Sequence, residues 1–279
     1  VIDGTTYAKN KALSATLSLT STALVENTVG YEVAVKSMDL AGNVSELSPE
    51  TTVIVDITPW DITTVPNLLE ADDKGFENED DITNVVQPRL ILSGLPTVLD
   101  SIRLFYKIGA GDDVLCGAYR MGQGTLDTVT VSSALSDNDY SFTYKLIDDA
   151  GNVSPAGTGL PVTLDATGPS QPATPDLTSE TDSGVSDSDN ITNSTTIGFS
   201  VASLNIGDRL YIKAENDTLD DFAAITATTQ VITITDADSA AYTVFSMDVA
   251  GNTSVASSGL TVDVDLAPPI VTGVVIDLD

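Results

Sequence analysis

Histidine is absent from the 279-residue sequence, and cysteine occurs once, as Cys116. Without histidine the chain cannot build a Ser-His-Asp or Cys-His catalytic group. Zinc is excluded as a structural metal, because such sites use cysteine and histidine ligands. A single cysteine also rules out an intramolecular disulfide. We therefore expect no enzyme, and a stability that comes from a packed core or from metal ions.

Positive charge is scarce as well. The sequence has 11 Lys and Arg residues against 41 Asp and Glu residues, a net charge of −30. Such a surface repels nucleic acid phosphates and anionic lipid, so neither nucleic acid nor a membrane is an expected partner of this segment. The same surface attracts divalent cations.

The residues that are present favour strands and turns. Apolar residues make up 42% of the sequence, mostly short runs of Val, Ile and Leu separated by Ser, Thr, Asn, Asp and Gly. The nearest approach to an amphipathic helix is 219–225, a turn or two at most. We expect an all-β fold.

One pattern occurs three times, at residues 31–45, 140–154 and 242–254. Each copy is an alternating strand that ends in Asp-x-Ala-Gly-Asn. A second aspartate follows each motif aspartate at the same interval of 17 residues and closes another alternating run. The motif aspartates are Asp39, Asp148 and Asp248, and the junction aspartates that follow them are Asp56, Asp165 and Asp265.

Two further elements recur in the same register. Residues 80–84 and 189–193 share Asp-x-Ile-Thr-Asn, and residues 103–107 match 209–213. The period is about 100 to 109 residues with roughly seven strands, which is typical of an immunoglobulin-like sandwich. We predict tandem immunoglobulin-like β-sandwich domains arranged end to end as a rod. The predicted domains are a partial repeat over 1–57 that lacks its opening strands, full repeats over 58–166 and 167–266, and the start of a further repeat over 267–279.

The repeated motif has a structural role and a possible metal-binding role. Its glycine can adopt the positive φ of a tight hairpin between strands F and G, and its Asp and Asn can hydrogen-bond the backbone of the turn. In this topology the F–G loop faces the previous domain. The A–B loop, the E–F loop and the end of strand G face the next one. The motif aspartate could therefore also reach a cation at a domain junction.

Carboxylates recur at these predicted junctions. Close to one another they would repel unless a cation neutralised them, and Ca²⁺ takes six to eight oxygen ligands in flexible geometry. The alternative is a set of solvated acidic loops. One junction is expected to combine Asp73, Asp80, Asp137, Asp139, Asp165 and Asp248. The full set of candidate calcium ligands is Asp56, Asp73, Asp80, Asp137, Asp139, Asp148, Asp165, Asp182, Asp187, Asp189, Asp236, Asp238, Asp248 and Asp265.

Residues 109–124 are an insert of the second repeat and include Cys116, which lies in the nine-residue excess of that repeat. The segment could be a ligand-binding protrusion, but a lengthened connection between strands C and E is the simpler interpretation.

The Asp-x-Ala-Gly-Asn-x-Ser hairpin, the proline linker after Val/Leu-Asp, and residues 182–193 resemble the bacterial Ig-like repeats of giant adhesins exported by type I secretion, such as SiiE. The resemblance covers essentially the whole chain. It implies an extracellular stalk of many calcium-rigidified domains on a Gram-negative surface. It also implies that neighbouring repeats of the same chain are the partners of this segment, and that any host-cell or surface receptor is bound by another part of the parent protein.

Two other interpretations stay open. One is a module that binds carbohydrate or protein through residues 109–124. The other is an ancillary domain of an enzyme, or a subunit of a surface layer or sheath.

Overall fold

The computed structural model describes residues 22–97, 101–120, 126–215 and 217–273. Every regular element in these ranges is a β-strand. The same ranges contain no helix that is long and apolar enough to cross a membrane. By its contacts the chain divides into two compact units. The first comprises Val1–Asn67, Leu90–Ser132 and Ser141–Leu160, and the second comprises Leu68–Arg89, Ser133–Tyr140 and Pro161–Asp279.

The first repeat contributes one antiparallel pair, β1 (Asn27–Val33) and β2 (Thr51–Val55), with Tyr31 opposite Val53. The part of this repeat before residue 22 lies outside the described residues.

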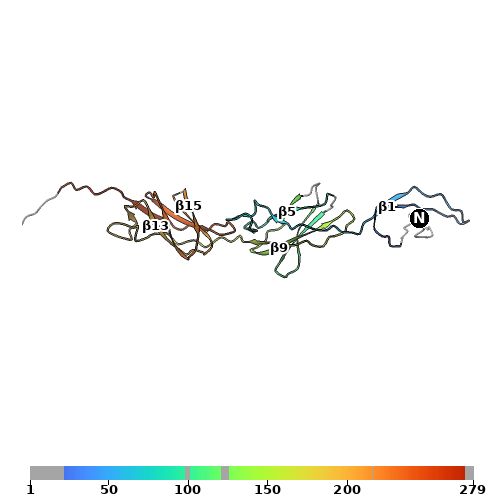
Figure 1. Cartoon of the computed structure of the whole chain (residues 1–279), viewed down its shortest axis with the longest axis horizontal. Coiled ribbons are helices and arrows are strands. Elements are labelled where there is room, and N and C mark those ends of the chain that lie inside the picture. Colours follow the sequence, from blue (N-terminus) through green and yellow to red (C-terminus); the bar gives the residue numbers. More distant parts are fainter. Residues whose placement is uncertain (1–21, 98–100, 121–125, 216, 274–279) are drawn as a thin grey trace, which may run out of the picture. The chain divides into compact units, whose positions relative to one another are not determined.

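Residues 58–166 form two sheets (Figure 1). The three-stranded sheet has the order β3 (Asn67–Leu68), β5 (Arg89–Ser93), β8 (Leu126–Thr130). The five-stranded sheet has the order β4 (Ile82–Thr83), β10 (Leu160–Leu164), β9 (Asn138–Ile147), β6 (Ser101–Ile108), β7 (Val114–Arg120).

Residues 167–266 repeat this arrangement. The three-stranded sheet has the order β11 (Asp176–Leu177), β13 (Ile197–Ala202), β16 (Thr229–Ile234). The five-stranded sheet has the order β12 (Ile191–Thr192), β18 (Leu260–Val264), β17 (Ala240–Met247), β14 (Arg209–Ala214), β15 (Asp217–Ala224). The prediction of an all-β chain of tandem immunoglobulin-like domains is confirmed.

Alternation along the strands places one face of each sheet in the core. In β13 the side chains of Ile197, Phe199 and Val201 are fully buried, and on β14 Leu210 and Ile212 are buried in the same way. Burying a side chain of this size stabilises the fold by about 1.5–3 kcal/mol. The third repeat thus has a packed apolar core that contributes to its stability.

In each repeat a tyrosine on the strand that corresponds to strand F, which is β1, β9 or β17, hydrogen-bonds the backbone of the preceding loop. Tyr140 donates its hydroxyl to the carbonyl of Ser136 at 2.7 Å, and Tyr242 donates to the carbonyl of Asp238 at 2.8 Å. In the first repeat Tyr31 donates to the carbonyl of Val25 at 3.1 Å. This contact is the tyrosine corner of immunoglobulin-like sandwiches.

Two sequence interpretations need correction. Residues 219–225 lie mainly in strand β15, which pairs antiparallel with β14, so that hydrogen bonds to a neighbouring strand take the place of those within a helix. Residues 109–120 are not a plain lengthened connection either, since 114–120 form β7, which pairs with β6 as β15 pairs with β14, and 121–124 lie outside the described residues. Cys116 is buried there, and burial raises the pKa of its thiol to about 12.

Candidate functional site

The Asp-x-Ala-Gly-Asn hairpin has the same geometry in all three repeats. One carboxylate oxygen of Asp248 accepts the backbone N–H of Asn252 at 2.8 Å, and the other accepts the Asn252 side-chain amide at 2.9 Å. The same pair of bonds joins Asp148 to Asn152 and Asp39 to Asn43. The motif glycines have φ of 88° or 89°, which only glycine adopts without strain. The turn-holding role predicted for this motif is therefore present in the structure.

The asparagine of the motif also reaches the preceding linker. Asn252 Nδ2 donates to the backbone carbonyl of Asp165 at 2.8 Å, and Asn152 Nδ2 donates to the carbonyl of Asp56 at 3.1 Å. A side-chain amide has two N–H donors, and one is already used within the hairpin. We call this contact the asparagine latch. Sequence reasoning missed it, although the invariant Asn at the end of all three hairpins was a visible signal.

The junction aspartates direct their carboxylates to their own linkers. Asp56, Asp165 and Asp265 each accept the backbone N–H two residues later, at 2.9 to 3.1 Å. Asp137 also binds this region, accepting the N–H of Ala166 at 2.7 Å and the hydroxyl of Thr167. These bonds lower the pKa of Asp137, with the Thr167 hydroxyl as the main cause.

The carboxylate of Asp208 feels the negative charges of both aspartates of the second latch, Asp165 and Asp248. Asp208 precedes β14 and is only 8% exposed, and its Oδ2 has no hydrogen-bond partner. Burial raises its pKa, and the negative charges of Asp248 and Asp165 raise it further. Sequence reasoning missed Asp208. The signal was that the matching position in the second repeat, Ile102, is apolar.

Residues 72–81 and 181–190, which we call the acidic loops, lead into β4 and β12. Asp73 and Asp182 are buried in them, at 5% and 4% exposure. The exposed Asp80 and Asp189 each accept the N–H two residues later, on Ile82 and Ile191. Burial raises the pKa of Asp73 to about 6, and the charges of Asp80 and Asp81 contribute. Asp73 and Asp80 thus lie close together within the acidic loop, and their predicted role as calcium ligands stays a prediction.

The first acidic loop contacts the third repeat inside the second compact unit. A Cβ placed on Gly75 would lie 1.8 Å from the carbonyl oxygen of Val249, next to the hairpin glycine Gly251. The guanidinium of Arg209 lies 4.3 Å from the centroid of the Phe76 ring. The predicted approach of this loop to the F–G hairpin of the next repeat is thus present, through residues that the sequence analysis had not selected.

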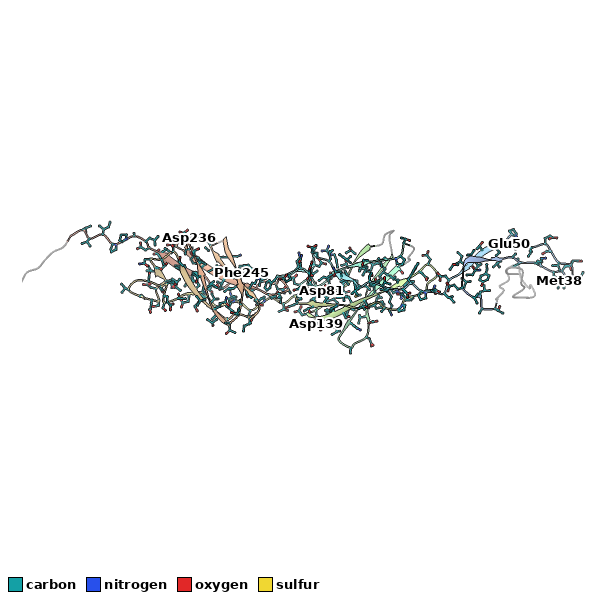
Figure 2. The ribbon with its side chains drawn as sticks, in the orientation of Figure 1. Met38, Glu50, Asp81, Asp139, Asp236 and Phe245 are labelled. Atoms are coloured by element: carbon teal, nitrogen blue, oxygen red, sulfur yellow. The ribbon has the colours of Figure 1, made fainter. Side chains whose placement is uncertain are left out.

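The remaining candidates are dispersed. Asp139 accepts the hydroxyl of Thr163 at 2.7 Å, and Asp187, Asp236 and Asp238 are exposed (Asp81, Asp139 and Asp236 are labelled in Figure 2). Across the part of the chain that the structure describes, no three acidic, cysteine or histidine side chains gather closely enough to hold one metal ion. The six aspartates expected at one junction thus do not form a single cluster there, and the calcium assignment stays a prediction.

A family model for the bacterial Ig-like domain matches residues 61–166 and again residues 169–266, which together exceed half of the chain. The chain belongs to the bacterial Ig-like domain family. Each match includes one acidic loop and the asparagine of one latch, Asn152 or Asn252, whereas the acceptor residues Asp56 and Asp165 precede the match that holds their donor.

The chain is similar to part of an enzyme and to solved structures of adhesins. Exoglucanase B of Cellulomonas fimi is 34% identical over 167 residues, which are 57% of this chain and 14% of that protein. The chain therefore spans a small part of that relative. Among solved structures, a 1.5-MDa bacterial ice-binding adhesin is 17% identical with a TM-score of 0.36, over 75% of this chain and 67% of that one. A tetra-tandem repeat from the extending region of a large adhesion protein is 18% identical with a TM-score of 0.30, over 84% of this chain and 56% of that one.

Proposed function

We propose that this chain is a non-catalytic stalk segment of a large bacterial surface or secreted adhesin, whose Ig-like repeats are held in a fixed orientation by calcium at their junctions. The observation that supports it best is the asparagine latch. The same amide-to-carbonyl bond joins successive repeats twice, from Asn152 to Asp56 and from Asn252 to Asp165. A spacer needs such a repeated junction, whereas a ligand-binding module does not.

Calcium fits the second junction through the chemistry of its donors. Asp165, Asp208 and Asp248 offer only oxygen atoms, and one buried Asp208 oxygen lacks a hydrogen-bond donor. Ca²⁺ prefers such oxygen ligands and accepts backbone carbonyls as well. Bound at the unpaired oxygen of Asp208, the ion would offset the negative charges of Asp248 and Asp165 that act on this carboxylate. At millimolar Ca²⁺ and a dissociation constant of about 0.1–1 mM, the gain is about 0.4–1.4 kcal/mol per junction.

Small-angle scattering of the whole chain tests the proposal. We expect EGTA to broaden the distribution of interatomic distances and to shorten its maximum, with Ca²⁺ restoring both and Mg²⁺ restoring neither. D208I is the matched variant, because Ile102 occupies the same position in the second repeat. It should reduce the response to EGTA while the core stays folded. Identical profiles with and without EGTA would contradict calcium rigidification.

The proposal extends to location and export. A stalk of this kind works outside the cell, and type I secretion suits an acidic chain that folds on meeting extracellular calcium. Any receptor of the adhesin would be bound elsewhere in the parent protein.

The likeness to Exoglucanase B favours a second candidate, an ancillary module of a secreted polysaccharide-degrading enzyme. A glycan array probed with the whole chain separates the two functions. A spacer should bind no glycan, and specific retention on β-glucans would favour the ancillary module.

A further inference from the structure

The contact between the first acidic loop and the hairpin of the third repeat is made by backbone atoms on both sides. On the loop side, a Cβ placed on Gly75 would lie 1.8 Å from the carbonyl oxygen of Val249 and 3.3 Å from the carbonyl carbon of Ala250. On the hairpin side, a Cβ placed on Gly251 would lie 3.1 Å from the backbone nitrogen of Gly75. Ala250 is only 1% exposed at this contact. The loop therefore covers the hairpin closely.

The second acidic loop has the same kind of glycine but an open surface. Gly184, which corresponds to Gly75, has a φ of 112°, and no atom lies within 4 Å of its Cβ position. Val185, the next residue, is fully exposed. The loop is held to its own sandwich all the same, because Thr192 donates its hydroxyl to the carbonyl of Thr181 at 2.7 Å. It is one half of the contact, already formed.

The hairpin of the first repeat is the other half. Leu40 and Ala41 are exposed, whereas Ala250, at the position that matches Ala41, is buried. Nothing lies within 4 Å of a Cβ placed on Gly42, although its φ of 89° equals the 88° of Gly251 within one degree. This hairpin thus has the conformation of its counterpart in the third repeat without a loop that covers it.

The asparagine latch is divided in the same way. Asn43 donates its side-chain amide to Asp39 Oδ2 at 2.8 Å, and within the described residues it makes no second bond like the one from Asn252 to Asp165. A side-chain amide has two N–H donors. The backbone carbonyl of Asp265, the counterpart of Asp165, accepts no hydrogen bond from the described part of the chain. One latch donor and one latch acceptor are therefore both unused.

We infer that a second copy of this chain docks on the third repeat, with the hairpin 39–43 of one copy packed on the acidic loop 181–190 of the other and Asn43 bound to the carbonyl of Asp265. The contact would repeat, between molecules, the packing and the latch that join the second repeat to the third within one chain. The two surfaces differ, so a docked pair keeps one hairpin and one loop open, and further copies add head to tail. The inference does not rest on the proposed stalk function.

This association should be weak and should strengthen with salt. An interface built from one loop, one hairpin and one hydrogen bond is much smaller than the interfaces of stable dimers. Two copies that each carry a net charge of −30 also repel each other, and salt screens that repulsion. We therefore expect docking at protein concentrations near the millimolar range, with more of it at higher ionic strength.

Sedimentation equilibrium of the whole chain, up to about 1 mM protein, tests the association. The average mass should rise with concentration above that of one chain. G184A should abolish the rise, because its Cβ has room in the free loop but would meet the carbonyl of Leu40 in the docked pair, as a Cβ on Gly75 would meet Val249. G207A is the matched control outside the loop, with a φ of 103° and an equally open Cβ position, and should leave the rise unchanged. The mass of one chain at every concentration and salt level would overturn the inference.

Disulfide trapping identifies the surfaces that meet. At the contact within the chain, the Cβ of Lys74 lies 3.5 Å from a Cβ placed on Gly251, a separation that a disulfide spans. The corresponding pair between copies is Ser183 and Gly42. A mixture of G42C and S183C proteins should therefore form a mixed dimer about tenfold faster than a mixture of G42C and D113C, because docking raises the effective concentration of the two thiols. Asp113 is exposed and lies outside the loop.

Two controls make the trapping result decisive. K74C/G251C should close a disulfide within one chain, and its failure to close would remove the contact on which the inference is based. The unmodified chain measures what Cys116 contributes, which should be little because this cysteine is buried. Equal rates for the two mixtures would overturn the inference even if the chain self-associates, since another surface would then be responsible.

Discussion

Asn252 donates its side-chain amide to the backbone carbonyl of Asp165, which lies 87 residues earlier in the chain and 2.8 Å away. The same side chain closes its own hairpin through Asp248. One residue therefore connects the geometry of a turn to the path of the preceding linker.

Removing this amide should loosen the second junction. N252A loses the bond to Asp165 and the bond to Asp248, at a cost of about 1–3 kcal/mol, and leaves the sandwich core untouched. We expect greater interdomain flexibility by small-angle scattering. N43A is the control, because the Asn43 amide donates to its own hairpin residue Asp39. Equal scattering changes in both variants would show that the hairpin, and not the latch, is responsible.

Gly75 and Gly184 form a matched pair for testing the contact between the first acidic loop and the next hairpin. Both have φ in the region that favours glycine, at 128° and 112°. A Cβ on Gly75 would collide with the carbonyl of Val249, whereas the same position at Gly184 is open. G75A should therefore lower the free energy of unfolding by about 1–3 kcal/mol more than G184A. Urea titration measures both. An equal loss would mean that backbone strain alone matters and that the contact is absent in solution.

The stacking of Arg209 on Phe76 should contribute measurable coupling. Cation–π pairs are worth about 0.5–2 kcal/mol according to how far they are desolvated. A double-mutant cycle of R209A and F76A, followed by thermal unfolding, should give a coupling free energy in that range. A cycle on Lys145 and Phe105, whose ammonium-to-centroid distance is 5.1 Å, supplies a comparison within one sandwich. Additive effects of R209A and F76A would indicate that the two side chains do not meet.

The hairpin of the first repeat should respond to pH. The side-chain amide of Asn43 is the main reason that the pKa of Asp39 is lowered from 3.8, with backbone N–H groups of the turn adding to it. A lowered pKa means that the ionised form is stabilised in the fold, so this contribution is present above the unfolded pKa and is lost as the pH falls through the folded one. Carboxyl NMR should show a midpoint below 3.8 that moves upward in N43A. A midpoint at or above 3.8 in the unmodified chain would contradict the hydrogen bonding described.

Local patterns in the sequence predicted the parts of the fold that local physics determines. Gly151 and Gly251 had to occupy tight hairpins, and the alternation around Leu210 and Ile212 had to place them inside a sheet. The two-residue strands β4 and β12 left no periodic signal, because two residues cannot show a period. Strand β15 carries a run of acidic residues, and its strand conformation comes from pairing with β14.

The candidate site was less predictable, because its contacts join residues far apart in the chain. Asp165 was predicted as a junction residue that offers its carboxylate to a cation, whereas its backbone carbonyl meets Asn252 and its carboxylate accepts an N–H of its own linker. Asp208 was missed because its sequence signal was only the apolar residue Ile102 at the matching position, and its burial is seen only in the structure. Gly75 and Phe76 gave no chemical signal at all, since a close packing contact requires no titratable or metal-binding group.

The short strand β4 runs parallel to β10, with Thr163 donating its N–H to Asp81 and Asp165 donating to Thr83. The third repeat repeats the arrangement, from Asp263 to Asn190 and from Asp265 to Thr192. Tension applied through the linker after Asp165 would pull β10 along its own axis past β4, so these bonds would be sheared together instead of being opened one after another. In each sandwich the last strand, β10 or β18, is therefore held against a pulling force by several hydrogen bonds that are loaded at the same time.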